Sequence, residues 1–283
     1  MAGLCDHNDT VLHVFIDTNV LLTFFSFAED DLEELRKIQT TINNNELKLW
    51  MTSQVIDELR RNRESKVAES MSALRKLKPA GGIPQIARNL PEFGGFLGAR
   101  REFERHLSLL CGELLSQFDG GTLAADDVLR ELLEATDTIA IDDDIVDAAR
   151  RRVDVGNPPG KKGSLGDAIN WECLLRCCPA GEDLHLVSAD SDFVSKMDSE
   201  RVSSSLAEEW RDAKSAEVHL YKRLSSFSVN GFRISSLPPS LRRSCELDSS
   251  LRAALLGKPT EPCRLFSTTR SLRNSRHAIC SIA

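Results

Sequence analysis

Short apolar segments alternate with amphipathic segments along most of this chain, and this alternation is its most constraining feature. Three apolar segments, Leu12 to Asp17, Leu47 to Thr52 and Leu184 to Ser188, have the length of buried strands and precede polar or turn-forming residues. Glu217 to Lys222 is a fourth candidate strand. Helices are expected between them at 30–42, 53–78, 100–118, 145–153 and 164–178. The pattern favours an α/β fold around a mainly parallel sheet.

Two regions fall outside this alternation. Residues from about 79 to 144 show no strand pattern and are interpreted as a helical insertion in a main domain of residues 1–235. Residues 236–283 contain eight Lys or Arg, three Asp or Glu and many Ser, which predicts a weakly ordered basic tail. The formal net charge of −7 argues against a broad electrostatic grip on nucleic acid. However, this tail carries +5, so the rest carries −12, and acids gathered at a metal site are neutralised by the metal.

Composition also restricts the cellular setting. No apolar run approaches the length of a membrane helix, and the polar segment Met1 to Thr10 does not resemble a secretory signal. The eight cysteines include no CxxC pair, so neither a zinc ribbon nor a redox motif is indicated. We therefore expect no membrane association, reduced and mostly buried thiols, and a cytoplasmic location.

Carboxylates lie at or just beyond the ends of two of the predicted strands. Asp17 ends the first, and Asp190 and Asp192 follow the third. Sites in open parallel sheets form beyond the carboxyl ends of the strands, and two acids separated by one residue project to one side if the backbone stays extended. Each residue has a simpler alternative, because Asp after a strand often starts a turn or caps a helix.

Two further acids lie on predicted helices. Glu58 falls in the second turn of a helix for which Ser53 is a plausible N-cap, although pairing with Arg61 or Asn62 on the surface is an alternative. Asp167 lies at a helix start, where Ser164-x-x-Asp167 also matches a capping box. A parallel sheet would bring these acids and the strand-end acids together. Such an oxygen-only cluster suits Mg²⁺ or Mn²⁺.

The combined motifs resemble the PIN-domain family, specifically larger bacterial PIN-like proteins with a helical insertion. The matching segments are FIDTNVLL at 15–22, SQVIDELRR at 53–61, GDAINWE at 166–172 and VSADSDF at 187–193. Their order and their strand or helix setting also match, and the resemblance extends from about 11 to 224. It implies a three-layer α/β fold with a mainly parallel central sheet.

The resemblance also implies a site and an activity. The metal ligands would be Asp17, Asp167, Asp190 and Asp192, and Glu58 would join them in catalysis. Two small polar residues would orient the ligands or the attacking water, namely Asn19 and Ser188. The implied reaction is metal-assisted hydrolysis of a phosphodiester, with RNA preferred to DNA as substrate because most of the family acts on RNA.

Basic residues near these acids could hold the substrate backbone, and the candidates are Arg60, Arg61, Arg63, Lys66, Lys161 and Lys162. A homodimer and an inhibitory partner protein are both compatible with the sequence. Two other functions stay open. The chain could be a non-catalytic nucleic-acid or partner-binding module, or Asp190-Ser191-Asp192 could be the nucleophile motif of a haloacid-dehalogenase-like phosphatase.

Overall fold

The computed structural model describes residues 11–26, 32–77, 82–160 and 164–228. Four strands form a parallel sheet in the order β2-β1-β5-β6, and two short strands, β3 and β4, form a second parallel pair. The strands are β1 (Leu12–Ile16), β2 (Leu47–Leu49), β3 (Met51–Thr52), β4 (Thr138–Ile139), β5 (Leu184–Val187) and β6 (Val218–Tyr221).

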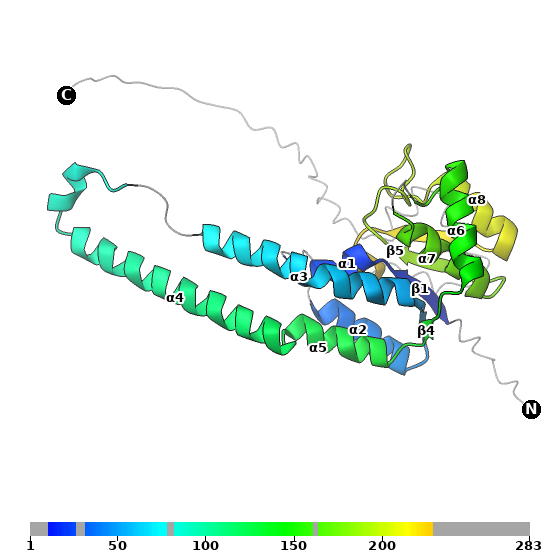
Figure 1. The fold of residues 1–283 in the computed structure, drawn as a ribbon, viewed down its shortest axis with the longest axis horizontal. Coiled ribbons are helices and arrows are strands. Elements are labelled where there is room, and N and C mark those ends of the chain that lie inside the picture. The colour runs from blue at the N-terminus through cyan, green and yellow to red at the C-terminus, as the bar shows by residue number, and fades with distance from the viewer. Residues whose placement is uncertain (1–10, 27–31, 78–81, 161–163, 229–283) are drawn as a thin grey trace, which may run out of the picture. The chain divides into compact units, whose positions relative to one another are not determined.

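Helices connect and cover these strands (Figure 1). They are α1 (Thr18–Thr23), α2 (Leu32–Asn43), α3 (Ser53–Lys76), the 3₁₀ helix η1 (Gln85–Asn89), α4 (Phe93–Gly120), α5 (Ala124–Glu134), α6 (Asp143–Val155), α7 (Gly166–Cys177) and α8 (Ser204–Lys214). None of the helices in the described ranges is long and apolar enough to cross a membrane.

The central sheet is buried on both faces, as an α/β architecture requires. Four of the five residues of β1 and all four of β5 are buried, although alternate side chains of a strand point to opposite faces. Strands buried in this way need helices on both sides, which gives a helix–sheet–helix arrangement. The predicted α/β fold with a parallel sheet is therefore confirmed.

Two strand predictions need correction. The segment from Leu47 to Thr52 is not one strand, because Trp50 separates β2 from β3 and the two pair in different sheets. Trp50 continues the ladder with β1 by donating its N–H to the Val14 carbonyl at 2.8 Å. The insertion of residues 79–144 is also not entirely helical, since it contains β4. That strand has two residues, too few to show an alternating pattern.

The predicted helix caps were wrong by one residue each. Thr52 caps α3 in place of Ser53, since the Thr52 hydroxyl accepts the Val55 N–H at 3.2 Å. The N-cap of α7 is Leu165, which makes no side-chain capping bond, so the predicted capping box at Ser164 does not form. Helix α8 was not predicted at all.

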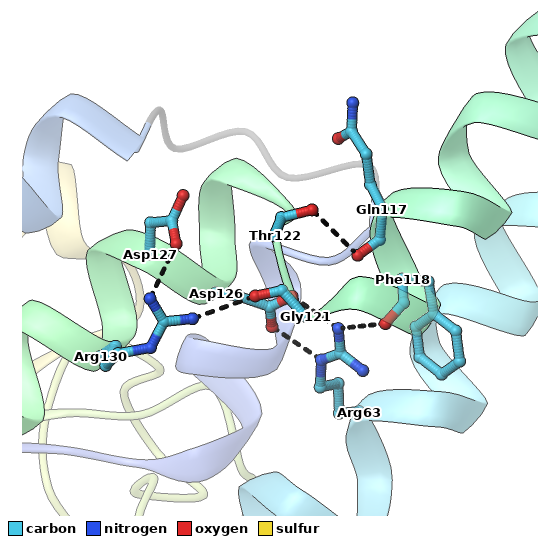
Figure 2. A network of polar contacts seen from close by, with 8 residues as sticks. All are labelled: Arg63, Gln117, Phe118, Gly121, Thr122, Asp126, Asp127 and Arg130. Carbon is cyan, nitrogen blue, oxygen red and sulfur yellow. Dashed lines mark hydrogen bonds and ion pairs between the residues drawn. The ribbon is translucent and has the colours of Figure 1, made fainter.

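Arg63 belongs to the packing of the insertion and is not available to hold substrate (Figure 2). Its Nε donates to Asp126 Oδ1 at 2.7 Å, and Nη2 donates to the Phe118 carbonyl at 3.2 Å. The guanidinium carbon also lies 4.4 Å from the centroid of the Phe118 ring. Gly121, whose φ of 62° favours glycine, ends α4 at this point. Arg63 thus joins α3 to the α4–α5 junction.

The four described cysteines form no disulfide, and two of them are buried. Cys173 and Cys178 are buried, and burial raises the pKa of each thiol to about 12. Cys177 is exposed and Cys111 half-buried, so the prediction of mostly buried thiols holds for two of the four. Other sequence predictions, including the basic tail at 236–283, Lys161 and Lys162, lie outside the described residues.

Candidate metal centre

The candidate site lies at the carboxyl edge of the sheet, between β1 and β5. The chain adds β2 on one side of β1 and then β5 and β6 on the other, so the direction of strand addition reverses between β1 and β5. Ligands of open α/β sheets bind at such a switch point. Ile16 pairs with Val187, which places Asp17 beside Ser188 just beyond the strands. Both residues are buried, and Ser188 Oγ donates to Asp17 Oδ2 at 2.5 Å.

The two acids after β5 lie in a tight turn. The Ser188 hydroxyl also accepts the Asp190 N–H at 3.0 Å, and Asp190 Oδ1 accepts the Asp192 N–H at 2.9 Å. The backbone therefore does not stay extended between the two acids. The turn proposed as the simpler alternative does form, yet the same bonds connect Asp190 to Ser188 and hence to Asp17. Asp190 therefore takes part in a local turn and also lies at the candidate site.

Glu58 is directed toward the sheet edge by its neighbours on α1 and α7. The Thr18 hydroxyl donates to Glu58 Oε2 at 3.3 Å. A Cβ atom added to Gly166, the first residue of α7, would lie 3.4 Å from the same oxygen. In the described part of the chain, Glu58 forms no ion pair with Arg61, which was the surface alternative for this residue.

Asp167 lies in the first turn of α7, where its carboxylate makes no capping bond. The next residue, Ala168, is fully buried, and the start of the helix is further fixed by Gly160, whose Cβ position is 3.2 Å from Ala168 Cβ. Gly160 has a φ of 125°, so a side chain there is excluded both sterically and conformationally. The close approach at Gly160 thus helps to set where Asp167 enters the site.

Electrostatics show that the predicted acids are neighbours. Burial raises the pKa of Asp17 to about 6, against the Ser188 hydrogen bond, and the charges of Glu58 and Asp190 raise it further. Burial raises the pKa of Asp167 to about 7, and the charges of Asp17, Asp190, Glu58 and Asp192 add to the effect. The charges of the other four carboxylates that the sequence singled out therefore act on Asp167 at this edge of the sheet.

This donor set fits a hard divalent cation in its chemistry. All the acids offer oxygen, and their mutual repulsion is relieved by a bound cation. The Asn19 side-chain oxygen is buried and has no hydrogen-bond partner among the described residues, as expected of a group directed at a ligand or its water. In these ranges no group of three or more His, Cys, Asp or Glu side chains is arranged closely enough to hold a metal ion by itself. Mg²⁺ does not require one, because it usually takes one or two carboxylates and keeps several waters.

A buried hydrogen bond between α3 and α7 was not anticipated from the sequence. The Thr52 hydroxyl donates to Asn170 Oδ1 at 2.6 Å while it caps α3. Asn170 follows Asp167 by one turn, and Thr52 precedes Glu58 on its own helix. The bond therefore sets the separation of the two helices that carry Asp167 and Glu58. The two partners are 118 residues apart along the chain, so no local pattern in the sequence connects them.

We expect Thr52→Val to weaken metal-dependent activity about 10-fold and to destabilise the fold by about 1–3 kcal/mol, because it leaves the buried Asn170 oxygen unpaired. The measurement is activity as a function of Mn²⁺ concentration, where the half-saturating concentration should rise. Thr41→Val is the matched control, since Thr41 is also buried but its hydroxyl donates to the Lys37 carbonyl of its own helix. An equal loss of activity in both variants would contradict a positioning role for Thr52.

A comparison with family models identifies the family of the chain. The chain matches the family model described as PIN domain over residues 14–193. It belongs to the PIN-domain family. No curated protein and no solved structure matches it. PIN domains are generally nucleases that use divalent metals and interact with nucleic acid. The matched range includes all five acids and excludes the tail, and membership of this family argues against the phosphatase alternative.

Proposed function

We propose that this PIN-domain protein is a nuclease that hydrolyses phosphodiester bonds in RNA with Mg²⁺ or Mn²⁺. The observation that carries the proposal is the coupling of Asp17 and Asp167 to three further carboxylates at the switch point of the sheet. Placing like charges together in a partly buried site is costly, and a cation bound between substrate phosphate and protein offsets that cost. The order of the strands in the sheet does not by itself require carboxylates to gather at this edge.

Each of these side chains would have a separate role in such a reaction. A bound divalent ion would supply an activated water and polarise the phosphoryl oxygen. Asp17, Asp167, Asp190 and Asp192 would hold the ion, and Ser188 keeps the Asp17 carboxylate in one orientation through its hydrogen bond. Glu58, held by Thr18, is the candidate for orienting the attacking water.

Substrate contact is proposed for Arg60 and Arg61, which are exposed on α3 beside Glu58. Arg60 Nη1 lies 3.7 Å from Asp57 Oδ1, and this solvent-exposed contact is weak enough to exchange for a phosphate. Lys161 and Lys162 in the loop before Asp167 remain proposed contacts. A cytoplasmic location is proposed because the sequence predicts reduced thiols and no disulfide framework.

The test is cleavage of labelled single-stranded RNA and DNA of one sequence, with Mn²⁺, with Mg²⁺ and with a chelator. Neighbouring residues supply a matched pair of variants, because Glu58 points to the site whereas Asp57 is exposed and pairs only with Arg60 in the described structure. Cleavage of RNA should require the metal, be lost in Glu58→Gln and survive in Asp57→Asn. Chelator-resistant cleavage would indicate a contaminant. Binding of RNA by the folded protein without cleavage would favour the non-catalytic alternative.

A further inference from the structure

The side-chain amide of Gln54 lies beside the candidate metal centre and makes no hydrogen bond within the described ranges. Gln54 precedes Glu58 by four residues on α3, so the two side chains lie one above the other on the same face of the helix. The Gln54 side chain is half-buried. Glu58 itself accepts a bond from the Thr18 hydroxyl. The Gln54 amide therefore keeps its N–H donors and its carbonyl acceptor for another partner.

Gly166, the first residue of α7, leaves room for this amide. A Cβ atom added to Gly166 would lie 3.0 Å from Gln54 Nε2 and 3.4 Å from Glu58 Oε2. The first distance is shorter than an ordinary van der Waals contact, so a side chain at this position would push the amide away. Gly166 has no positive φ, and its backbone therefore does not require glycine. The glycine is explained by the close approach of Gln54 and Glu58 to the start of α7.

The packing of α3 against α7 fixes the position of the amide. The Thr52 hydroxyl donates to Asn170 Oδ1 at 2.6 Å. Along the chain, this bond lies two residues before Gln54 on one side and one helical turn after Gly166 on the other. The amide is thus placed between Glu58 and the residue that precedes Asp167, without a hydrogen bond of its own in the described structure.

The chemistry of the surrounding groups indicates what this amide binds. An ionised carboxylate only accepts hydrogen bonds, so the acids of the candidate metal centre offer no donor to the oxygens of a phosphodiester. Gln54 Nε2 supplies N–H donors without adding a charge. The backbone of a nucleic acid offers matching acceptors in its phosphate and sugar oxygens, and contacts of this kind fix the register of the strand.

We propose that Gln54 is a substrate-binding residue, whose Nε2 donates a hydrogen bond to a sugar–phosphate oxygen of the nucleotide at the scissile bond. This inference rests on the proposed nuclease function and adds a substrate contact next to the metal ligands. Gly166 keeps the space for the amide free, and the bond between Thr52 and Asn170 holds the two helices at the required separation.

The first test compares Gln54→Met with the full-length wild type in steady-state cleavage of a labelled single-stranded RNA. Methionine has a similar length and helix propensity but no N–H donor. KM should rise at least about 10-fold while kcat changes less than about 3-fold, because the lost bond holds bound substrate and transition state alike. Gln117→Met is the matched control, since Gln117 is also half-buried on a helix but donates to Glu113 Oε1 at 3.1 Å. It should behave like the wild type.

Metal dependence separates a substrate contact from a positioning role. In Gln54→Met the half-saturating Mn²⁺ concentration should stay within about 2-fold of the wild-type value, whereas loss of a residue that orients the metal ligands would raise it. Gln54→Glu keeps the size of the side chain and should raise KM more than Gln54→Met does, because it places a negative charge beside the phosphates. It also keeps the test valid if Gln54→Met loses helix content in circular dichroism. An unchanged KM in both variants, or a raised Mn²⁺ requirement in Gln54→Met, would overturn the proposal.

RNA affinity distinguishes failure of this inference from failure of the proposed function. Fluorescence anisotropy of the same RNA is measured with Ca²⁺, which also takes oxygen ligands. Gln54→Met should bind RNA at least about 10-fold more weakly than the wild type, and this loss would support the contact even if the wild type cleaved nothing. With DNA of the same sequence, a phosphate contact predicts a similar loss, whereas a 2′-hydroxyl contact predicts a loss for RNA alone. A wild type that cleaves RNA, with variants that bind it equally tightly, would refute the role of Gln54 and leave the nuclease function intact.

Discussion

Asp167→Asn is expected to reduce metal-dependent cleavage at least about 100-fold while making the metal-free protein more stable by roughly 1–2 kcal/mol. The activity falls because one of the oxygen ligands loses its charge. The stability rises because Asp167 is partly buried and surrounded by the charges of other carboxylates, which raise its pKa to about 7. A substitution that only damaged the fold could not produce a loss of activity together with a gain in stability.

The stability gain of Asp167→Asn over the wild type should increase as the pH rises. Asp17 and Asp167 have pKa values of about 6 and about 7 in the folded protein, both above the ordinary value of 3.8. The folded state therefore binds these protons more tightly than the unfolded chain. The stability that protonation contributes is complete below about pH 4 and is lost as the pH rises through 6 and 7. Asp167→Asn should thus exceed the wild type in stability mainly above about pH 6.

Thermal unfolding in chelator and in Mn²⁺, at a series of pH values, measures both the stability gain of Asp167→Asn and its dependence on pH. The metal should raise the unfolding temperature of the wild type more than that of Asp167→Asn, because a ligand that binds only the folded state stabilises it by mass action. Asp57→Asn, on the exposed face of α3, should behave like the wild type. An Asp167→Asn protein that is less stable than the wild type in chelator at neutral pH would contradict the charge-repulsion argument.

The sequence predicted the strand ends well because each depends on local information. A buried strand is a short apolar run. Asp17 directly follows β1 and Asp190 lies three residues after the end of β5, so topology alone places them at the same sheet edge. Strand β4 was missed because two residues carry no periodicity, and its position is determined by pairing with β3. The division of β2 from β3 at Trp50 likewise depends on which sheet each segment joins.

Hydrogen-bond partners could not be predicted, because they join residues far apart in the chain. Ser188 was expected to assist the site, but its bond to Asp17 spans 171 residues. Thr52 and Asn170 each look ordinary in the sequence, and only the packing of α3 against α7 makes them a pair. The assignment of Ser164 as a cap failed for the opposite reason: a local motif matched, but α7 starts later, at Gly166. Local patterns therefore located the acids, and long-range packing determined how they are held.

Arg152→Ala is expected to destabilise the protein by about 2–4 kcal/mol, because it leaves two carboxylates without their buried partner. The Arg152 side chain is 7% exposed. Its Nε donates to Glu172 Oε1 at 2.7 Å, Nη2 donates to Glu209 Oε1 at 2.5 Å, and Nη1 donates to the Pro158 carbonyl at 2.7 Å. One guanidinium on α6 thereby joins α7, α8 and the loop before α7, and Trp171 Nε1 adds a bond to Glu209 at 2.9 Å.

Arg150→Ala supplies the control on the same helix. The Arg150 side chain is 61% exposed and, among the residues that the structure describes, pairs only with Asp147, three residues earlier. Its removal should therefore change stability by less than about 0.5 kcal/mol. Chemical denaturation of the three proteins measures the difference. Because Glu172 follows Asp167 by five residues on α7, Arg152→Ala should also reduce cleavage under conditions where the variant remains folded. Equal stability of the two Arg variants would show that Glu172 and Glu209 find other partners, and that α6 does not hold the helix carrying Asp167.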